Sequence, residues 1–221
     1  MQDNFIYQPP REPIKVLYQD KDILIASKPS GLLSVPGSKP ERCDSMLSRL
    51  KEIEPRVLAV HRLDMDTSGV MVFALRKKAE AQLREQFRNR AIGKVYKAIV
   101  QGALEVDVPR EIDAPIAPDP KQKHRYHVAN TGKIAKTSYQ VLLRGNNCAL
   151  VSLRPITGRS HQLRVHMKHI GHPILGDRFY APPEVITRSE RLMLHAESIV
   201  FTHPYSGEEL SFSVQTPFTV F

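Results

Sequence analysis

Short apolar runs, separated by polar turns, recur along most of this chain. Apolar residues often occupy every second position in them, which is the period of a β-strand with one buried face. Lys94–Val100 is an example, because Tyr96, Ala98 and Val100 share one face of the predicted strand. This pattern and the short β-branched runs predict strands at residues 15–18, 23–26, 57–60, 70–75, 94–100, 137–143, 148–153, 192–201 and 210–214.

Other segments repeat apolar residues every three or four positions, which predicts helices buried on one side. The first helix is predicted to begin at an Asp44 cap and to end at Ile53, and the second covers Lys77–Arg90. The third runs from Ser160 to a stop at Gly171. The outer face of the second helix is predicted to carry Arg84, Arg88 and Arg90. These arginines either contact phosphate or are only solvated.

A polar loop, His61–Gly69, separates two of the predicted strands. If its first residues are extended, Arg62 and Asp64 lie on one face and His61 on the other. Thr67–Gly69 supplies hydroxyl groups and a flexible residue that suit a turn back into the sheet. Spacing alone is compatible with an ordinary surface ion pair as well as with a reactive carboxylate.

The charge balance of the chain indicates a polyanionic partner. Its 221 residues carry a formal net charge of +9, which suits nucleic acid or an anionic membrane surface. No apolar run is long enough to cross a bilayer, and the first residues do not form a signal peptide, so we expect a cytoplasmic protein. Cys43 and Cys148 lack metal-site spacing and are predicted to be reduced thiols.

Residues 101–136 are rich in proline and charge, and we predict that they form a long loop. Lys121, Lys123 and Arg125 form a basic cluster in it beside Tyr126. A basic loop with an aromatic residue can grip a nucleic acid strand, although an exposed loop has a similar composition.

Four histidines in and beside the third predicted helix raise the question of a metal site: His161, His166, His169 and His172. Their spacing contains no HExxH pattern, and no cysteine pair lies near them. We therefore expect no metal site here. Arg164 lies in the first turn of the same helix, where a positive charge opposes the helix dipole and needs a compensating anion, for which Asp64 is a candidate.

Three motifs give the chain a resemblance to the RluA family of RNA pseudouridine synthases. Residues 61–69 resemble the family signature HRLDxxTSG, in which the aspartate at the position of Asp64 is catalytic. Tyr96 matches the tyrosine that lines the uridine pocket in a KxYxA context. Arg164 matches the last residue of RxHQxR, which pairs with the catalytic aspartate in the family.

The resemblance extends from about Val16 to Phe212 and implies a fold. It implies a single α+β catalytic domain over residues 14–221, with a mixed, largely antiparallel sheet flanked by helices, after an extended arm at residues 1–13. Many relatives carry an additional N-terminal S4 RNA-binding domain, which we expect to be absent here. The expected state is a monomer that needs no cofactor.

The reaction that the resemblance implies breaks the bond between C1′ and N1 of a uridine and joins C1′ to C5. The carboxylate of Asp64 either attacks C1′ or removes the 2′ proton, and the sequence does not choose between these routes. Arg164 favours and orients the carboxylate, and Tyr96 stacks on the uracil and is a candidate acceptor for the C5 proton.

The target uridine must first leave its stack, and the resemblance suggests that Arg62 fills the vacated space or clamps the backbone. Further RNA contacts are predicted for His61, Thr67, Arg159, His161, Gln162, Lys121, Lys123 and Arg125.

The implied substrates are a uridine in the tRNA anticodon stem-loop and one in a 23S rRNA hairpin, so the expected partners are tRNA and large-subunit rRNA. A different tRNA or rRNA site is the alternative within the family. Two other classes remain open. A glycosidase would use Asp64 with Asp66, which an extended backbone separates by roughly 6 to 7 Å. An RNA-binding protein without catalysis would tolerate Asp64→Asn.

Overall fold

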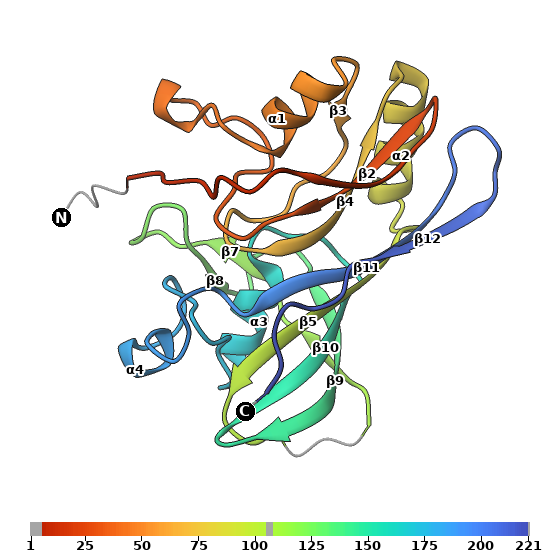
Figure 1. Cartoon of the computed structure of the whole chain (residues 1–221). Helices are drawn as coiled ribbons and strands as arrows, with labels where there is room; N and C mark the ends of the chain where they lie inside the picture. Colours follow the sequence, from red (N-terminus) through yellow and green to blue (C-terminus); the bar gives the residue numbers. More distant parts are fainter. Residues whose placement is uncertain (1–5, 105–107, 221) are drawn as a thin grey trace. The chain divides into compact units, whose positions relative to one another are not determined.

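The computed structural model describes residues 6–104 and 108–220, and these residues form two compact units (Figure 1). Unit 1 comprises the chain up to Ala91 together with Phe201–Phe212, and unit 2 comprises Ile92–Val200 and the segment from Ser213 onward. Residues 1–5 of the predicted arm are outside the described ranges. Residues 6–13 lie in unit 1 and contain no helix or strand.

Unit 1 contains an antiparallel sheet in which β2 (Ile23–Lys28) lies between β1 (Lys15–Gln19) and β4 (Ser68–Ala74). The short β3 (Leu58–Ala59) pairs with β4. Every residue of β4 is buried, as expected for the apolar run that follows the polar loop. The polar loop therefore follows β3, and its last two residues, Ser68 and Gly69, begin β4.

The helices of unit 1 are α1 (Met46–Ile53) and α2 (Lys77–Arg88), with a short 3-10 turn, η1 (Pro40–Arg42). Asp44 was predicted to cap α1, and this prediction is wrong. Ser45 is the cap, because its hydroxyl accepts the Ser48 backbone N–H while the Ser48 hydroxyl accepts the Ser45 N–H. Asp44 instead binds the Arg49 guanidinium at 2.7 Å.

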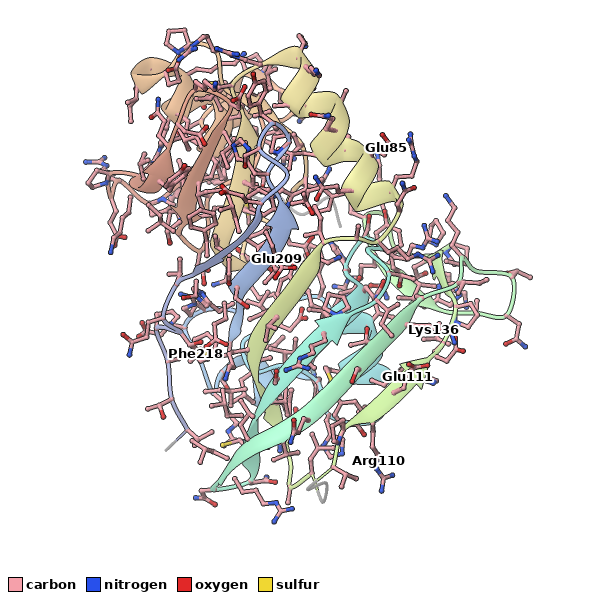
Figure 2. The ribbon with its side chains drawn as sticks, turned by 90° about the vertical axis from the view of Figure 1, so that its right-hand side faces the viewer. Glu85, Arg110, Glu111, Lys136, Glu209 and Phe218 are labelled. Carbon is pink, nitrogen blue, oxygen red and sulfur yellow. The ribbon has the colours of Figure 1, made fainter. Side chains whose placement is uncertain are left out.

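Unit 2 contains an antiparallel sheet in the order β11 (Leu194–Thr202), β5 (Gly93–Gln101), β10 (Cys148–Pro155), β9 (Lys136–Gly145) and β6 (Arg110–Asp113). The last two residues of β11 belong to unit 1. At the outer edge, the Lys136 ammonium on β9 lies 3.5 Å from Glu111 and 2.7 Å from Asp113 on β6 (Figure 2). β12 (Glu209–Ser213) pairs with β11.

The two faces of the unit 2 sheet are covered by different elements. On one face, Leu163 and Met167 of α3 (Gln162–His169) pack in one core cluster with Ala98 and Val100 of β5. On the other, Val185 of the short α4 (Pro183–Ile186) and the C-terminal Phe218 pack near Ile99 and Leu150. Residues of β5 therefore alternate between two separate cores.

The prediction of a long loop at residues 101–136 was only partly correct. Besides β6 it contains β7 (Ile116–Pro118) and β8 (Tyr126–Val128), which form a two-stranded sheet. These strands have three or four residues, and proline and charge occupy most of their exposed positions, so the alternation is too short to recognise. α3 also begins two residues later than predicted, because His161 adopts a left-handed conformation with φ of 55°.

The predicted α+β class, with a largely antiparallel sheet and few helices, is confirmed. Gly171 ends α3 as predicted, with φ of 85°, a conformation that glycine adopts at little cost. Cys43 and Cys148 are both free thiols. Within the described ranges, none of the helices combines the length and the apolar character needed to span a bilayer.

Candidate active site

Asp64 lies on the segment that connects β3 to β4 in unit 1. Leu63 beside it is buried, whereas Arg62 is exposed and the Asp64 carboxylate is partly exposed. This alternation agrees with the extended backbone expected for the segment. The chain then turns back, because the Thr67 N–H donates to the Asp64 carbonyl at 3.1 Å, and Thr67 itself is buried.

A second loop of unit 1, at residues 28–34, holds this segment in place. The Lys28 ammonium is buried, with 1% of the residue exposed, and donates to the carbonyl oxygens of Met65 at 2.7 Å and Leu32 at 2.5 Å. The Ser34 hydroxyl donates to the Leu63 carbonyl and accepts the Leu63 N–H, at 2.7 and 3.0 Å. The residues on both sides of Asp64 are thus fixed by buried hydrogen bonds.

The His61 side chain is held by contacts within unit 1. Its Nε2 accepts the Val72 backbone N–H at 3.1 Å, and its ring stacks on Phe87 of α2 with 4.7 Å between centroids. These contacts join the start of the polar loop to β4 and to α2. The predicted contact of His61 with RNA stays a prediction.

Tyr96 lies near the middle of β5 in unit 2. Leu153 of β10 and Ala196 of β11 are its direct partners across the two neighbouring strands. The side chain is half-buried and packs against the core cluster that contains Leu163 and Met167 of α3. Tyr96 therefore presents part of a rigidly held ring on the face of the sheet that carries α3.

Arg164 is buried in the first turn of α3, and an anion compensates its charge. Asp177 binds it through two parallel hydrogen bonds of 2.8 Å, from Nε to Oδ2 and from Nη2 to Oδ1. The backbone N–H groups of Phe179 and Tyr180 also donate to Asp177 Oδ1. Asp177 is in unit 2 with Arg164, whereas Asp64 is in unit 1, and the pairing of Arg164 with Asp64 stays a prediction.

The left-handed His161 at the start of α3 is held by Tyr180. The Tyr180 hydroxyl lies 2.6 Å from His161 Nδ1 and accepts the backbone N–H of Tyr126 at 3.0 Å. These two contacts fix the orientation of the His161 ring.

Gln162, the next residue, is buried and its amide is engaged within unit 2. Oε1 accepts the Thr157 hydroxyl at 2.7 Å, and Nε2 donates to the Lys136 carbonyl at 2.9 Å. These bonds fix the start of α3 to the end of β10 and the beginning of β9. Contact of Gln162 with RNA stays a prediction.

The predicted basic loop lies between β7 and β8. Lys121 and Lys123 are exposed, and Asp119 closes the turn by accepting the Lys121 N–H at 2.8 Å. The Arg125 guanidinium lies 5.3 Å from the ring centroid of Phe179, and the Arg164 guanidinium lies 5.1 Å from the same centroid. Unit 2 therefore brings the basic loop, Phe179 and the start of α3 together.

Arg159 precedes α3 and is partly exposed. Its Nε donates to the Ile134 carbonyl at 3.0 Å, which holds the side chain against the strand-free segment before β9. Its assignment as a phosphate contact stays a prediction.

Sequence reasoning missed the residues that hold the candidate site, namely Lys28, Ser34, Asp177 and Tyr180. Two of them have a recognisable feature in the sequence. Lys28 is a charge at the end of an apolar strand, and Asp177 follows the apolar pair Ile174–Leu175. A charge next to a buried segment indicates a buried partner.

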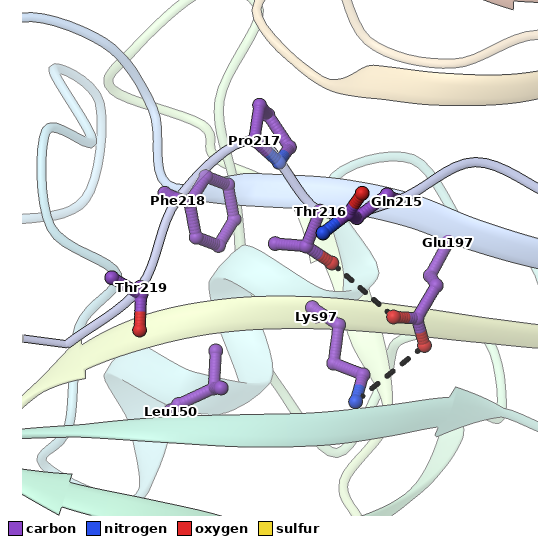
Figure 3. Close-up of a pocket in the computed structure, with 8 residues that line it drawn as sticks. All are labelled: Lys97, Leu150, Glu197, Gln215, Thr216, Pro217, Phe218 and Thr219. Carbon is purple, nitrogen blue, oxygen red and sulfur yellow. Dashed lines mark hydrogen bonds and ion pairs between the residues drawn. The ribbon is translucent and has the colours of Figure 1, made fainter.

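A hollow of about 460 Å³ in unit 2 lies away from these residues (Figure 3). Lys97, Leu150 and Phe218 are among its lining residues, and the Lys97 ammonium pairs with Glu197 at 3.5 Å. Lys97 and Tyr96 are consecutive in β5, so they project from opposite faces of the sheet. The hollow is therefore separate from the face that carries Tyr96 and α3.

Several histidines use ring nitrogens in hydrogen bonds with the protein. His166 lies 2.9 Å from both the Thr137 hydroxyl and the Ala114 carbonyl, and His172 Nδ1 lies 2.8 Å from the Gln101 carbonyl. Burial lowers the pKa of His166, so the neutral form is favoured. These bonds give the histidines a structural explanation.

Asp20, Asp22 and His203 form the cluster of possible metal ligands found among the described residues. His203 Nδ1 accepts the backbone N–H groups of Tyr205 and Ser206, and Nε2 lies 3.0 Å from Asp20 Oδ2. The Nε2 hydrogen therefore points at Asp20, and the arrangement is that of a hydrogen-bonded turn.

Comparisons with known proteins identify a family and several relatives of this chain. A family model described as RNA pseudouridylate synthase matches residues 22–169. The dual-specificity RNA pseudouridine synthase RluA of Salmonella typhimurium strain LT2 is 50% identical over 219 residues, which cover 96% of this chain and 98% of that protein. The RluA of Haemophilus influenzae is 48% identical over 215 residues, with the same coverage.

A solved structure is also similar. The human RNA Pseudouridylate Synthase Domain Containing 1 has a TM-score of 0.80 and 26% sequence identity, and the match covers 99% of this chain and 88% of that chain.

Proposed function

The chain belongs to the RNA pseudouridylate synthase family, and we propose that it isomerises specific uridines of tRNA and of large-subunit rRNA to pseudouridine, with Asp64 as the catalytic residue. It is an isomerase and RNA is its substrate. The observation that carries the proposal is the identity of about one half to proteins named dual-specificity synthases over almost the whole chain. Glycosidase chemistry and binding without catalysis are both disfavoured by this match.

Asp64 supplies the carboxylate of the proposed mechanism. In one route a carboxylate oxygen attacks C1′ while the bond from C1′ to N1 breaks and uracil leaves with the electron pair. The uracil turns, C5 attacks C1′, and the carboxylate departs. In the other route the carboxylate removes the 2′ proton while the bond from C1′ to N1 breaks, which leaves a glycal. C5 of the turned uracil then adds to C1′ and the proton returns to C2′. In both, the C5 proton leaves and N1 gains one, so the reaction is an isomerisation.

Arg164 and Tyr96 complete the proposed site. A guanidinium that is locked by Asp177 can hold the Asp64 carboxylate in one orientation, since its own position is fixed by two 2.8 Å bonds. The ring of Tyr96 offers a surface for stacking the uracil, and its hydroxyl is the candidate acceptor for the C5 proton.

The proposed substrate uridine is turned out of its stack before the reaction. Unstacking costs a few kcal/mol, which contacts with the protein must offset. Arg62 is exposed and two residues from Asp64, so it is placed to occupy the space that the base leaves. Arg159, His161 and the basic loop at residues 121–125 supply candidate phosphate contacts.

Asp64→Asn tests the catalytic assignment. An amide has nearly the same shape but lacks the charge, so we expect pseudouridine formation to fall by at least about a thousandfold while RNA affinity changes little. The measurement is tritium release from RNA labelled at C5 of uridine. Asp66→Asn is the matched control, since a glycosidase would need Asp66 as its acid and a synthase would not. Full activity of Asp64→Asn would refute the proposal.

The RNA targets are tested separately. A site-resolved pseudouridine map compares RNA from cells with and without this protein. We expect the loss of one pseudouridine in the tRNA anticodon stem-loop and one in a 23S rRNA hairpin. Losses at other tRNA or rRNA positions would support the alternative within the family. A cytoplasmic location and a monomeric state are further parts of the proposal.

A further inference from the structure

Lys94 differs from the other lysines that are shielded from solvent. Lys28 donates to backbone carbonyls, Lys97 pairs with Glu197 at 3.5 Å, and Lys136 pairs with Asp113 at 2.7 Å. Lys94 is partly buried, yet its side chain makes neither a hydrogen bond nor an ion pair with the described part of the chain. Its charge is therefore left without compensation.

An uncompensated charge of this kind is unfavourable for stability. Burial lowers the pKa of Lys94 below the ordinary value for lysine, which indicates that the ammonium has lost part of its hydration. A lysine that only packs its methylene groups would keep the ammonium in water and avoid this cost. The position thus suits an anion that arrives from outside the unit.

The surroundings of Lys94 indicate where this anion would bind. Lys94 and Tyr96 are two residues apart on β5, so their side chains project from the same face. The Lys94 ammonium lies 3.9 Å from the position that a Cβ atom of Gly158 would occupy. Gly158 is exposed and precedes Arg159, and its missing side chain leaves room for a ligand beside the ammonium.

We propose that Lys94 binds a phosphodiester group of the RNA next to the target uridine. This inference deepens the proposed function and rests on it, since it places the phosphate beside the base that Tyr96 contacts. A phosphate is a full negative charge with several acceptor oxygens, and it would supply the compensation that the protein lacks.

The test is the salt dependence of RNA binding. Each phosphate contact adds about 0.7 to 0.9 to the slope of the logarithm of affinity against the logarithm of salt concentration. Binding is measured in the Asp64→Asn background, so that turnover does not intervene, with an unmodified tRNA transcript as the probe. We expect Lys94→Met to reduce the slope by about 0.7 to 0.9, and Lys94→Arg to retain it, because arginine keeps the charge.

Lys97→Met is the matched control. It removes a lysine from the same strand, but from the opposite face, so we expect the slope to stay at the wild-type value. The thermal midpoint of Lys94→Met should equal or exceed that of the wild type, since the variant loses an uncompensated charge and no bond. An unchanged slope in Lys94→Met, or an equal reduction in Lys97→Met, would overturn the inference.

The two proposals can fail independently. If the wild type forms no pseudouridine but Lys94→Met has the reduced slope, the proposed function fails and the phosphate contact stands. If the wild type is active and the slopes are equal, the phosphate contact fails and the proposed function stands. A lower reaction rate with unchanged affinity would also overturn the inference, because Lys94 would then act on the base.

Discussion

Most buried ionisable side chains described in this protein have specific hydrogen-bond partners. Lys28 has three carbonyl oxygens, Arg164 has both oxygens of Asp177, and the two ring nitrogens of His166 face Thr137 and Ala114. Removing one member of such a set leaves another polar group buried without a partner, which costs about 1 to 3 kcal/mol or more. Substitutions here should affect folding before they affect chemistry.

His166 makes stability depend on pH. Burial lowers its pKa in the folded state below the unfolded value of about 6.5, so the unfolded chain binds more protons below that pH. The contribution of His166 is therefore fully present above about pH 6.5 and is lost as the pH falls through the folded pKa. Denaturant midpoints at pH 7.5 and pH 5 measure this loss.

His166→Gln should reduce that loss, because an amide can occupy the site without titrating. It should not abolish it, since burial also lowers the pKa of His195. Equal losses of stability in the variant and the wild type would contradict this assignment.

At the scale of elements, Tyr180 joins the basic loop to the start of α3. Its hydroxyl contacts both the Tyr126 backbone at the end of the loop and His161 at the helix start. The Arg125 and Arg164 guanidinium groups lie 5.3 and 5.1 Å from the ring centroid of Phe179, the residue beside Tyr180. A change at this junction should therefore affect both of these elements, which are predicted to contact RNA.

Tyr180→Phe removes the hydroxyl and keeps the ring. We expect the free energy of unfolding to fall by about 1 to 2 kcal/mol and kcat/KM for RNA to fall severalfold, because His161 loses its anchor. Denaturant unfolding and single-turnover kinetics measure the two effects. Tyr139→Phe is the control, since Tyr139 is also a buried residue, but its hydroxyl makes no hydrogen bond with the described residues. A similar kinetic loss in both variants would argue against the role of Tyr180.

The elements that the sequence predicted well are those whose alternation is long. β5, β9, β10 and β11 have eight to ten residues, and each was placed to within a few residues. β6, β7 and β8 were missed because three or four residues carry too little pattern. The α1 cap was misplaced by one residue, because Asp44 and Ser45 are both favourable cap residues. The Asp44 carboxylate pairs instead with Arg49 of the same helix.

For the candidate site, the sequence indicated the motif residues but not the residues that hold them. Asp64, Tyr96 and Arg164 were found through motifs, and the family that those motifs indicated is confirmed. Asp177 and Lys28 act through contacts with residues 13 and 37 positions away along the chain, as in the Arg164 and Met65 bonds. Local periodicity contains no information on such pairs, so only a fold could reveal them.

At the scale of the whole molecule, unit 1 is made from two distant parts of the sequence. Phe201 is buried and stacks on Phe212 at 6.1 Å, and Phe212 lies 5.3 Å from Tyr18 of β1. His203 pairs with Asp20 in the turn after β1. The segment Phe201–Phe212 is therefore part of the core of the N-terminal unit.

Phe201→Ala should destabilise the protein by about 3 to 5 kcal/mol through the cavity that it leaves. Because of the ring contacts, hydrogen exchange should accelerate first in β1, more than 180 residues away in sequence. Phe218→Ala is the control, as Phe218 packs in unit 2 and should leave β1 protected. Early exchange in β9 or β10 with β1 still protected would contradict this view of unit 1.

The divided origin of unit 1 has a consequence for synthesis on the ribosome. Residues 6–91 emerge first, but the strand and rings that complete their core are translated last, after all of Ile92–Val200. The N-terminal part of the nascent chain cannot complete its core, and keeps apolar side chains exposed, until the last codons are translated. Unit 2, by contrast, has nearly all of its strands available earlier, and newborn chains should depend on chaperones chiefly for their first ninety residues.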